Sequence, residues 1–102
     1  MTTVYVTAPP ESADDISKTL LEERLAACVN RFECHSTFLW DGDIVDEDES
    51  ALLVKTTAER YDDVEARIRE LHPYDVPCIE RFEPADGLKE FSAWISTTVQ
   101  SD

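Results

Sequence analysis

Hydrophobic residues in the first third of the chain change from strand spacing to helical spacing. Residues 4–7 are an extended run of Val, Tyr and Thr, and Pro9-Pro10 follows shortly after them. Proline is favoured at the first position of a helix, where its missing N–H would have no intrahelical partner. Apolar side chains then recur at helical spacing, at Ile16, Leu20, Leu21, Leu25 and Ala27. The pattern predicts a strand followed by a helix.

A long hairpin is predicted in the middle of the chain. Residues 28–40 are rich in Val, Phe, Thr and Trp, and they end at the turn signal Asp41-Gly42-Asp43. Residues 44–45 and 51–56 supply the return strand. About 13 residues precede the turn, whereas an ordinary strand has about five or six.

The second half of the chain repeats the order of helix and strand. Across residues 58–71, one helical face carries Tyr61, Val64, Ile68 and Leu71. Residues 76–82 are predicted as a strand, and a short C-terminal helix follows Gly87. The order strand, helix, strand, strand, helix, strand is that of the split βαβ, or ferredoxin-like, arrangement. We therefore predict an α+β, ferredoxin-like βαββαβ sandwich in a single domain, 1–102.

In such a sandwich two helices cover one face of the sheet and leave the other face bare. A long hairpin and an uncovered sheet face both favour association with another protein chain. We expect the bare face and the hairpin to be buried in a homo-oligomer.

Two prolines four residues apart create a rigid corner after the second helix. Pro73 disfavours helical geometry at His72, and Pro77 favours extended geometry at the residue before it. The corner presents an imidazole, a phenol and a carboxylate within four residues, which suits a binding site. The alternative is structural, with His72 capping the helix and Tyr74 packing under the corner.

The chain is strongly acidic. Its 23 acidic residues oppose 9 basic ones, which gives a formal net charge of -14 at pH 7, and only three of the basic residues are lysine. Because such a charge repels a phosphate backbone, nucleic acid is excluded as a partner. The acidity either gathers cations or keeps the protein solvated in concentrated salt. The dispersed acids and scarce lysine favour the second, halophilic interpretation.

The chain carries no signal of export or membrane insertion. No apolar stretch reaches the roughly 20 residues that span a bilayer, and the N-terminus lacks a basic start with an apolar core. We expect no membrane association and a cytoplasmic location. Cys28, Cys34 and Cys78 are an odd number at irregular spacing, so we predict thiols, mostly buried, rather than a disulfide framework.

Several short segments together resemble one family over nearly the whole chain. They are Thr7-Ala8-Pro9, Arg24-Leu25-Ala26-Ala27-Cys28-Val29, Trp40-Asp41-Gly42, Val54-Lys55-Thr56-Thr57, His72-Pro73-Tyr74 with Val76-Pro77, and Trp94-Ile95. The chain thus resembles the CutA (CutA1) divalent-ion tolerance family. The resemblance implies a subunit similar to the PII signalling proteins, a homotrimer, and a non-enzymatic role in the response to copper and other divalent metal ions.

The resemblance leaves the metal site incomplete. It implies copper ligands at a first-strand cysteine and two adjacent histidines, which here are Val6, Leu71 and His72. Cys78 stands where the family commonly has glutamate. Because thiolate and imidazole both suit Cu(I) and Zn(II), we predict a candidate site at His72 and Cys78, with Cys34 and His35 as further candidates on opposite strand faces. No cofactor is required, and copper or another divalent cation is the candidate ligand.

A second function class follows from the PII-like architecture. It is a small-molecule or signalling module in which Trp40, Lys55 and Tyr74 line a cleft between subunits, together with His72. The alternative for Lys55 is that its amine reaches solvent or pairs with a nearby acid. An enzyme is the weakest class, because the sequence has no Gly-rich phosphate loop and no nucleophile signature.

The acidic run 41–49 does not fit a calcium loop. An EF-hand counted from Asp41 needs glycine at its sixth position and glutamate at its twelfth, where this chain has Asp46 and Leu52. We interpret the run as a solvated hairpin tip.

Overall fold

Four antiparallel strands form one sheet in the order β2-β3-β1-β4. In this computed structural model, which describes residues 1–100, the elements are β1 (Thr2–Ala8), α1 (Pro10–Glu22), β2 (Cys28–Trp40), β3 (Asp43–Thr56), the 3₁₀ turn η1 (Ala58–Arg60), α2 (Tyr61–Leu71), β4 (Cys78–Phe82) and α3 (Lys89–Thr98). The last two residues of the predicted domain lie outside the described residues. The predicted ferredoxin-like order, with its additional C-terminal helix, is confirmed.

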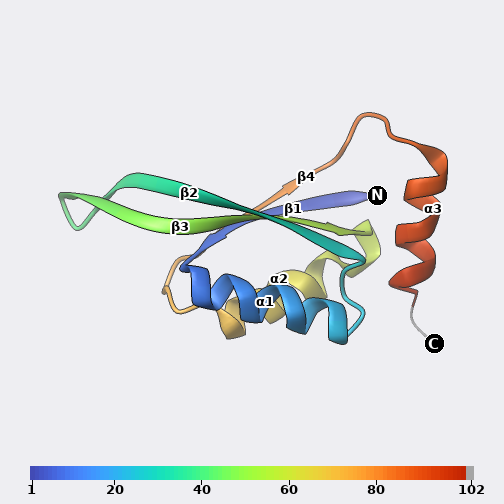
Figure 1. The fold of residues 1–102 in the computed structure, drawn as a ribbon, viewed down its shortest axis with the longest axis horizontal. Coiled ribbons are helices and arrows are strands. Elements are labelled where there is room, and N and C mark those ends of the chain that lie inside the picture. The colour runs from blue at the N-terminus through green and yellow to red at the C-terminus, as the bar shows by residue number, and fades with distance from the viewer. Residues whose placement is uncertain (101–102) are drawn as a thin grey trace.

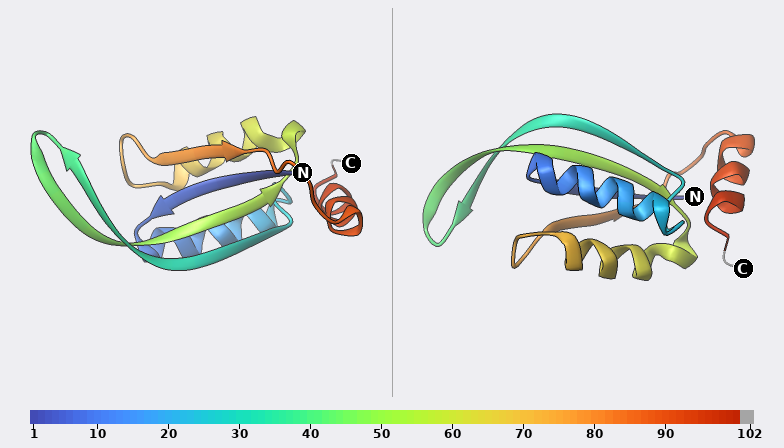
Figure 2. Two further views of the ribbon diagram at one scale, coloured as in Figure 1. Left: turned by 90° about the horizontal axis from the view of Figure 1, so that it is seen from above. Right: turned by 60° about the horizontal axis from the view of Figure 1, so that its bottom comes forward.

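The two faces of the sheet have different environments. Helices α1 and α2 lie side by side on one face, and α3 lies at the end of the sheet beside the N-terminus (Figures 1 and 2). In β1 the side chains of Val4 and Val6 point to the helices and are fully buried, whereas Tyr5 and Thr7 alternate onto the uncovered face and are half-buried. We call this second surface the open face.

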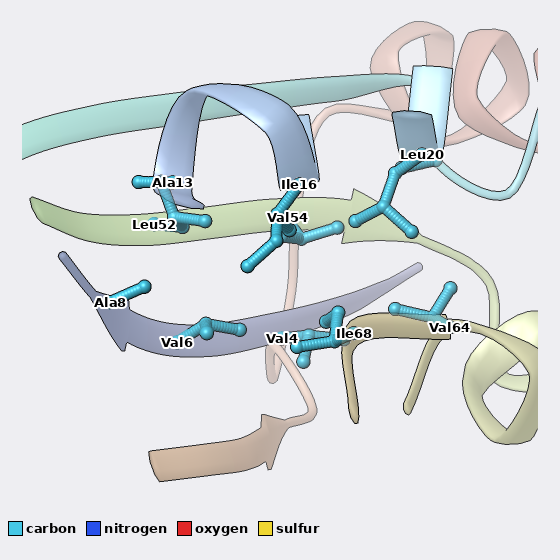
Figure 3. Packing of buried hydrophobic residues seen from close by; sticks show 11 residues of the cluster. Val4, Val6, Ala8, Ala13, Ile16, Leu20, Leu52, Val54, Val64 and Ile68 are labelled. Atoms are coloured by element: carbon cyan, nitrogen blue, oxygen red, sulfur yellow. The ribbon is translucent and has the colours of Figure 1, made fainter. Parts of the chain in front are cut away.

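The hydrophobic core fills the space between the sheet and the two helices (Figure 3). Ile16 and Leu20 of α1 and Ile68 of α2 have no exposed surface. They meet Leu52 and Val54, which β3 contributes in register with β1. Burial of these side chains, at about 25 cal/mol per Å² of apolar surface, is the main force that holds the layers together.

Helix α1 is shorter than the apolar stripe predicts. It ends at Glu22, because Arg24 adopts the left-handed backbone (φ 56°) and the Leu25 N–H bonds back to the Leu20 carbonyl at 2.9 Å. The expectation that the stripe continues through Leu25 and Ala27 was wrong. Leu25 instead packs against the core from the loop, and the Ala27 N–H already bonds to β3.

In the central hairpin, strand β2 has the predicted length of 13 residues, whereas β3 is one continuous strand of 14 residues that also contains residues 46–50, which the predicted return strand left out. The hairpin turn holds Asp41 and Gly42 at φ 50° and 82°, the pattern of a type I′ turn that suits strand twist. Because β1 pairs with β3 only as far as Ser50, residues 34–49 extend beyond the rest of the sheet. This hairpin arm curves away from the body in both views of Figure 2.

Two boundaries predicted from the sequence differ in the structure. Strand β4 begins at Cys78 rather than at residue 76, because Pro77 has no N–H to donate to the ladder and Val76 is 70% exposed. The second helix is preceded by the 3₁₀ turn η1, which the sequence pattern merges with α2. His72 ends α2 in extended geometry (φ -82°, ψ 135°), as Pro73 predicts.

Two adjacent leucines of α1 test the position of the core. Leu20→Ala is expected to lower the free energy of unfolding by about 2 to 5 kcal/mol, because the side chain is fully buried and its removal leaves a cavity. Leu21→Ala, at a position 42% exposed, is expected to cost less than about 1 kcal/mol. Guanidinium unfolding at one fixed protein concentration measures both. Equal losses would contradict this assignment of the helix face.

Candidate functional site

A groove of about 720 Å³ lies on the open face where the hairpin arm leaves the body. Tyr5 and Thr7 of β1 and Cys78 of β4 border it, and the arm lines one side. The loop 73–76, which follows α2, lines the other side. Three separate segments of the chain thus meet at the end of β1.

Cross-strand register brings β4 to this end of the groove. Thr7 pairs with Cys78 of β4 on one side and with Ala51 of β3 on the other. Because side chains in paired positions share a face, Cys78 points to the open face beside Thr7. The chain therefore offers one thiol directly to the groove.

His72 holds the loop 73–76 in place. Its Nε2 lies 2.8 Å from the Thr7 carbonyl oxygen, and the Tyr74 N–H donates to Nδ1 at 3.2 Å. Since Nδ1 accepts a hydrogen, Nε2 carries the proton and donates to Thr7, which defines one neutral tautomer. The imidazole is 7% exposed, and the Tyr74 ring lies against it with centroids 4.8 Å apart. His72 therefore links the end of α2 to the end of β1.

This geometry restricts metal binding within one chain. His72 and Cys78 both lie against Thr7, yet neither imidazole nitrogen is free while the two hydrogen bonds are made. Across residues 1–100, no group of three or more His, Cys, Asp or Glu side chains is arranged to hold a metal ion. A metal ion could bind His72 only after a hydrogen bond is broken, and a full set of ligands would need a second chain.

The groove has a strongly negative environment. Glu47, Glu49 and Asp75 line it, and no Lys, Arg or His among the described residues does. Burial raises the pKa of both Tyr5 and Tyr74, and the negative charge of Glu49 raises the pKa of each further. The phenols therefore stay protonated and can donate hydrogen bonds into the groove.

The structure brings together some of the predicted site residues and separates others. Trp40, Tyr74 and Cys78 line the groove. His72 lies behind the loop and supports Tyr74 rather than facing the groove. Lys55 does not reach the groove in the same chain.

Lys55 lies at the opposite end of the open face. It pairs with Cys28 of β2 and Thr3 of β1, six residues along β3 from Glu49. At about 3.3 Å per residue this separates the two side chains by roughly 20 Å. The Lys55 charge slightly offsets the effect of burial, which raises the pKa of the Cys28 thiol.

Sequence reasoning missed the most buried acid of the groove. Glu49 ends an acidic run that was interpreted as a solvated tip, and for Glu49 that interpretation was wrong, since it is only 5% exposed. The signal that could have found it is strand alternation. Glu49 is in phase with Ala51 and Leu53, which point to the open face.

The three cysteines are also less buried than expected. Cys28, Cys34 and Cys78 are free thiols with intermediate exposure. All three lie on the open face, which no helix covers, and this explains why the prediction of mostly buried thiols fails in the isolated chain.

On the other face of the arm, His35 bridges two carboxylates. Its Nδ1 lies 2.8 Å from an Asp48 oxygen and its Nε2 lies 3.3 Å from an Asp46 oxygen, which also accepts from Thr37 at 2.7 Å. The hydrogen bond with Asp48, followed by the one with Asp46, raises the pKa of His35 above its ordinary value. All of these side chains are well exposed to solvent, so the effect is screened by salt.

The His35 pair predicts a pH dependence of the arm. Because the folded-state pKa is raised, protonated His35 stabilises the arm fully below its unfolded pKa of about 6.5, and this stabilisation is lost as pH rises through the folded pKa. NMR titration of the His35 ring protons should give a midpoint above that value at low salt. Asp48→Asn should lower the midpoint, whereas Glu33→Gln on the same strand should leave it nearly unchanged. An unshifted midpoint in the unmodified protein would contradict the pairing.

The fold and the groove define a small ferredoxin-like α+β protein with a groove on the open face of its sheet. The family model described as CutA1 divalent ion tolerance protein matches residues 2–98. The divalent-cation tolerance protein CutA of Archaeoglobus fulgidus is 45% identical over 98 residues, which cover 95% of this chain and 96% of that protein. The chain therefore belongs to the CutA1 divalent ion tolerance protein family, and the predicted resemblance is confirmed.

Solved structures agree with this assignment. The periplasmic divalent cation tolerance protein CutA from Archaeoglobus fulgidus superposes with a TM-score of 0.94 at 44% identity, covering 98% of this chain and 100% of that chain. The PII-like protein CutA from Nostoc sp. PCC 7120 has the same TM-score at 30% identity, covering 98% of each chain. Within residues 1–100, no helix is both long and apolar enough to cross a membrane.

Proposed function

We propose that the protein is a non-enzymatic divalent-cation tolerance protein that responds to metal ions as a homotrimer. Family membership supports the role, since the related proteins carry that name. The observation that supports the trimer is the exposure of large aromatic side chains on the open face. On it Phe32 is 53% exposed and Phe82 is 46% exposed, although both belong to a regular sheet. Aromatic side chains left in water favour burial by a second copy.

The proposed metal ion, copper or another divalent cation, binds at Cys78 and His72. Cys78 is the thiol that the groove offers, and thiolate is a preferred ligand of Cu(I) and Zn(II). Zn(II) sites have four ligands, so this proposal requires His72 to release a hydrogen bond and a second subunit to supply donors. The trimer and the metal site are therefore coupled in this proposal.

A small-molecule or signalling role is the second candidate, and the groove favours it. Ligand sites are commonly concave, with apolar walls and a few polar groups, and Trp40 and Tyr74 supply such walls. If Lys55 belongs to the same cleft, it comes from another subunit, because its own groove lies at the other end of the sheet.

We further propose a cytoplasmic location and adaptation to concentrated salt. The net charge of -14 is spread over exposed positions, and of the acidic side chains in residues 1–100 only Glu49 is buried. Dense exposed charge of one sign destabilises a compact state unless salt screens it. The relative from Archaeoglobus fulgidus is described as periplasmic, so location is tested by fractionation of the source cells.

Metal binding is tested by anaerobic calorimetry of the reduced protein with Cu(I) supplied from a chelator of known affinity. We expect binding at a fixed ratio per subunit, tighter than micromolar, that Cys78→Ser abolishes because the thiolate is lost. Cys28→Ser is the matched control, since Cys28 lies at the far end of the open face and should leave the affinity unchanged. His72→Ala, checked for unchanged folding by circular dichroism, should also weaken binding. No binding beyond the chelator would refute the metal site.

Assembly is tested by light scattering in molar KCl and after dilution to low salt. A trimer is expected at high salt, with loss of assembly or a lower melting temperature as screening is removed. Phe32→Glu should dissociate the trimer because it places a charge in the proposed interface. Leu21→Glu, on the outer side of α1, should leave the trimer intact. A monomer at high salt would remove the oligomer from the proposal, and a melting temperature independent of KCl would remove the salt adaptation.

A further inference from the structure

Glu49 is a buried acid that makes no ion pair within residues 1–100. It is 5% exposed, and no other acidic side chain in this part of the chain is buried. A hydrogen bond joins it to Tyr74, whose pKa is raised by burial, by the charges of Glu49 and Glu47, and by this bond. The Oε2 atom of Glu49 accepts no hydrogen bond from any described residue. Because a buried carboxylate is costly unless a cation pairs with it, this site is incomplete in a single chain.

Strand alternation decides which basic side chains belong to the open face. The four strands of residues 1–100 contain Arg31, Lys55 and Arg81 as their basic residues. Arg31 and Arg81 pair with residues that are fully buried under the helices, so they lie on the helix side of the sheet. Lys55 is six residues along β3 from Glu49 and in phase with it. Lys55 is therefore the one cation that these strands present on the open face.

Lys55 lacks a partner as well. Its side chain is half-buried, and none of the ion pairs in residues 1–100 includes it. Six residues of strand, at about 3.3 Å each, separate it from Glu49 by roughly 20 Å, so the two charges cannot meet in one chain. The open face thus carries a buried anion at one end and a cation without an ion pair at the other.

A second copy on the open face would bring the two ends together. The apolar surface between them favours such a contact. Phe32 pairs with Ala51, which lies between the two charges along β3, and Phe32 is 53% exposed. A contact in which two different ends of a surface meet is heterologous, and it closes into a ring when the rotation between copies allows. Each copy in such a ring offers Glu49 to one neighbour and Lys55 to the other.

We propose that the subunits of the homotrimer are joined by an ion pair in which the Lys55 ammonium of one subunit binds the Glu49 carboxylate of the next. The inference rests on the proposed homotrimer and deepens it by naming the residue that each copy contributes to its neighbour. An ammonium group has three N–H donors, so it can donate to Glu49 Oε2 while Tyr74 keeps its own hydrogen bond. A closed ring leaves neither charge without a partner.

The experiment is a double-mutant cycle with the neutral variants Glu49→Gln and Lys55→Gln. The melting temperature of the trimer is measured in molar KCl at one protein concentration. Each single variant should melt below the unmodified protein, and Lys55→Gln should lose at least about 5 °C because it leaves a buried carboxylate unpaired. In the Lys55→Gln background, Glu49→Gln should raise the melting temperature, since it neutralises that carboxylate. The two positions are too far apart to couple within one chain, so this change of sign would locate the pair between subunits.

Lys89→Gln is the matched control, because it removes the same charge from the exposed start of α3. In the Lys89→Gln background, Glu49→Gln should still lower the melting temperature. The ion pair is overturned if Glu49→Gln shifts the melting temperature with the same sign in the Lys55→Gln background as in the unmodified protein, whichever sign that is.

Light scattering of the same variants separates this inference from the homotrimer on which it rests. If Lys55→Gln folds, as judged by circular dichroism, but no longer assembles, the double variant should regain the trimer, and failure to regain it would overturn the pair. A monomer of the unmodified protein in molar KCl would overturn the homotrimer and the pair together. A trimer in which the two losses simply add would overturn the pair alone.

Discussion

The pairing of β1 with a strand on each side is the constraint on which the rest of the structure depends. In the sheet of residues 1–100, β1 lies between the hairpin and β4, and its alternation assigns the paired residues of both neighbours to a face. Val4 and Val6 build the core under the helices, and Tyr5 and Thr7 build the floor of the groove. A slip of one residue in this register would exchange the two sets of side chains. Core and site are therefore specified by the same seven residues.

The imidazole of His72 connects the end of the sheet to the loop that lines the groove. His72 ends α2, donates to the Thr7 carbonyl and accepts from Tyr74, so that the loop 73–76 is held at the end of β1. The prolines on both sides limit the backbone of the corner, which reduces the entropy lost when Tyr74 is placed. A residue that looks like a ligand in the sequence thus serves first to position other groups.

Local signals in the sequence were sufficient to predict the order of the helices and strands and to recognise the resemblance to the family. Pro10, Gly42 and Pro73 act within a few residues, and helical or alternating periodicity can be recognised within one segment. Sites depend on pairing between distant segments, which no local pattern contains. Trp40 and Tyr74 were predicted to line a cleft and Cys78 to bind a metal ion, and all three lie at the groove. The distance of Lys55 from the groove and the burial of Glu49 follow only from the register of β3 with β1 and β2. The end of α1 was missed because Arg24 adopts a backbone conformation that its residue type does not favour.

The charge of the chain and the character of the groove are connected by one physical argument. A protein with a net charge of -14 gains little by burying another carboxylate, since desolvation and repulsion from nearby acids both oppose it. Every other acidic side chain in residues 1–100 avoids this cost by remaining partly or fully exposed, several of them beside an arginine or lysine. At Glu49 the hairpin register places the side chain on the open face, and the arm and loop exclude water from it. A positive charge that comes from outside this chain can offset the cost, and in the proposed homotrimer a second copy that covers the open face is such a source.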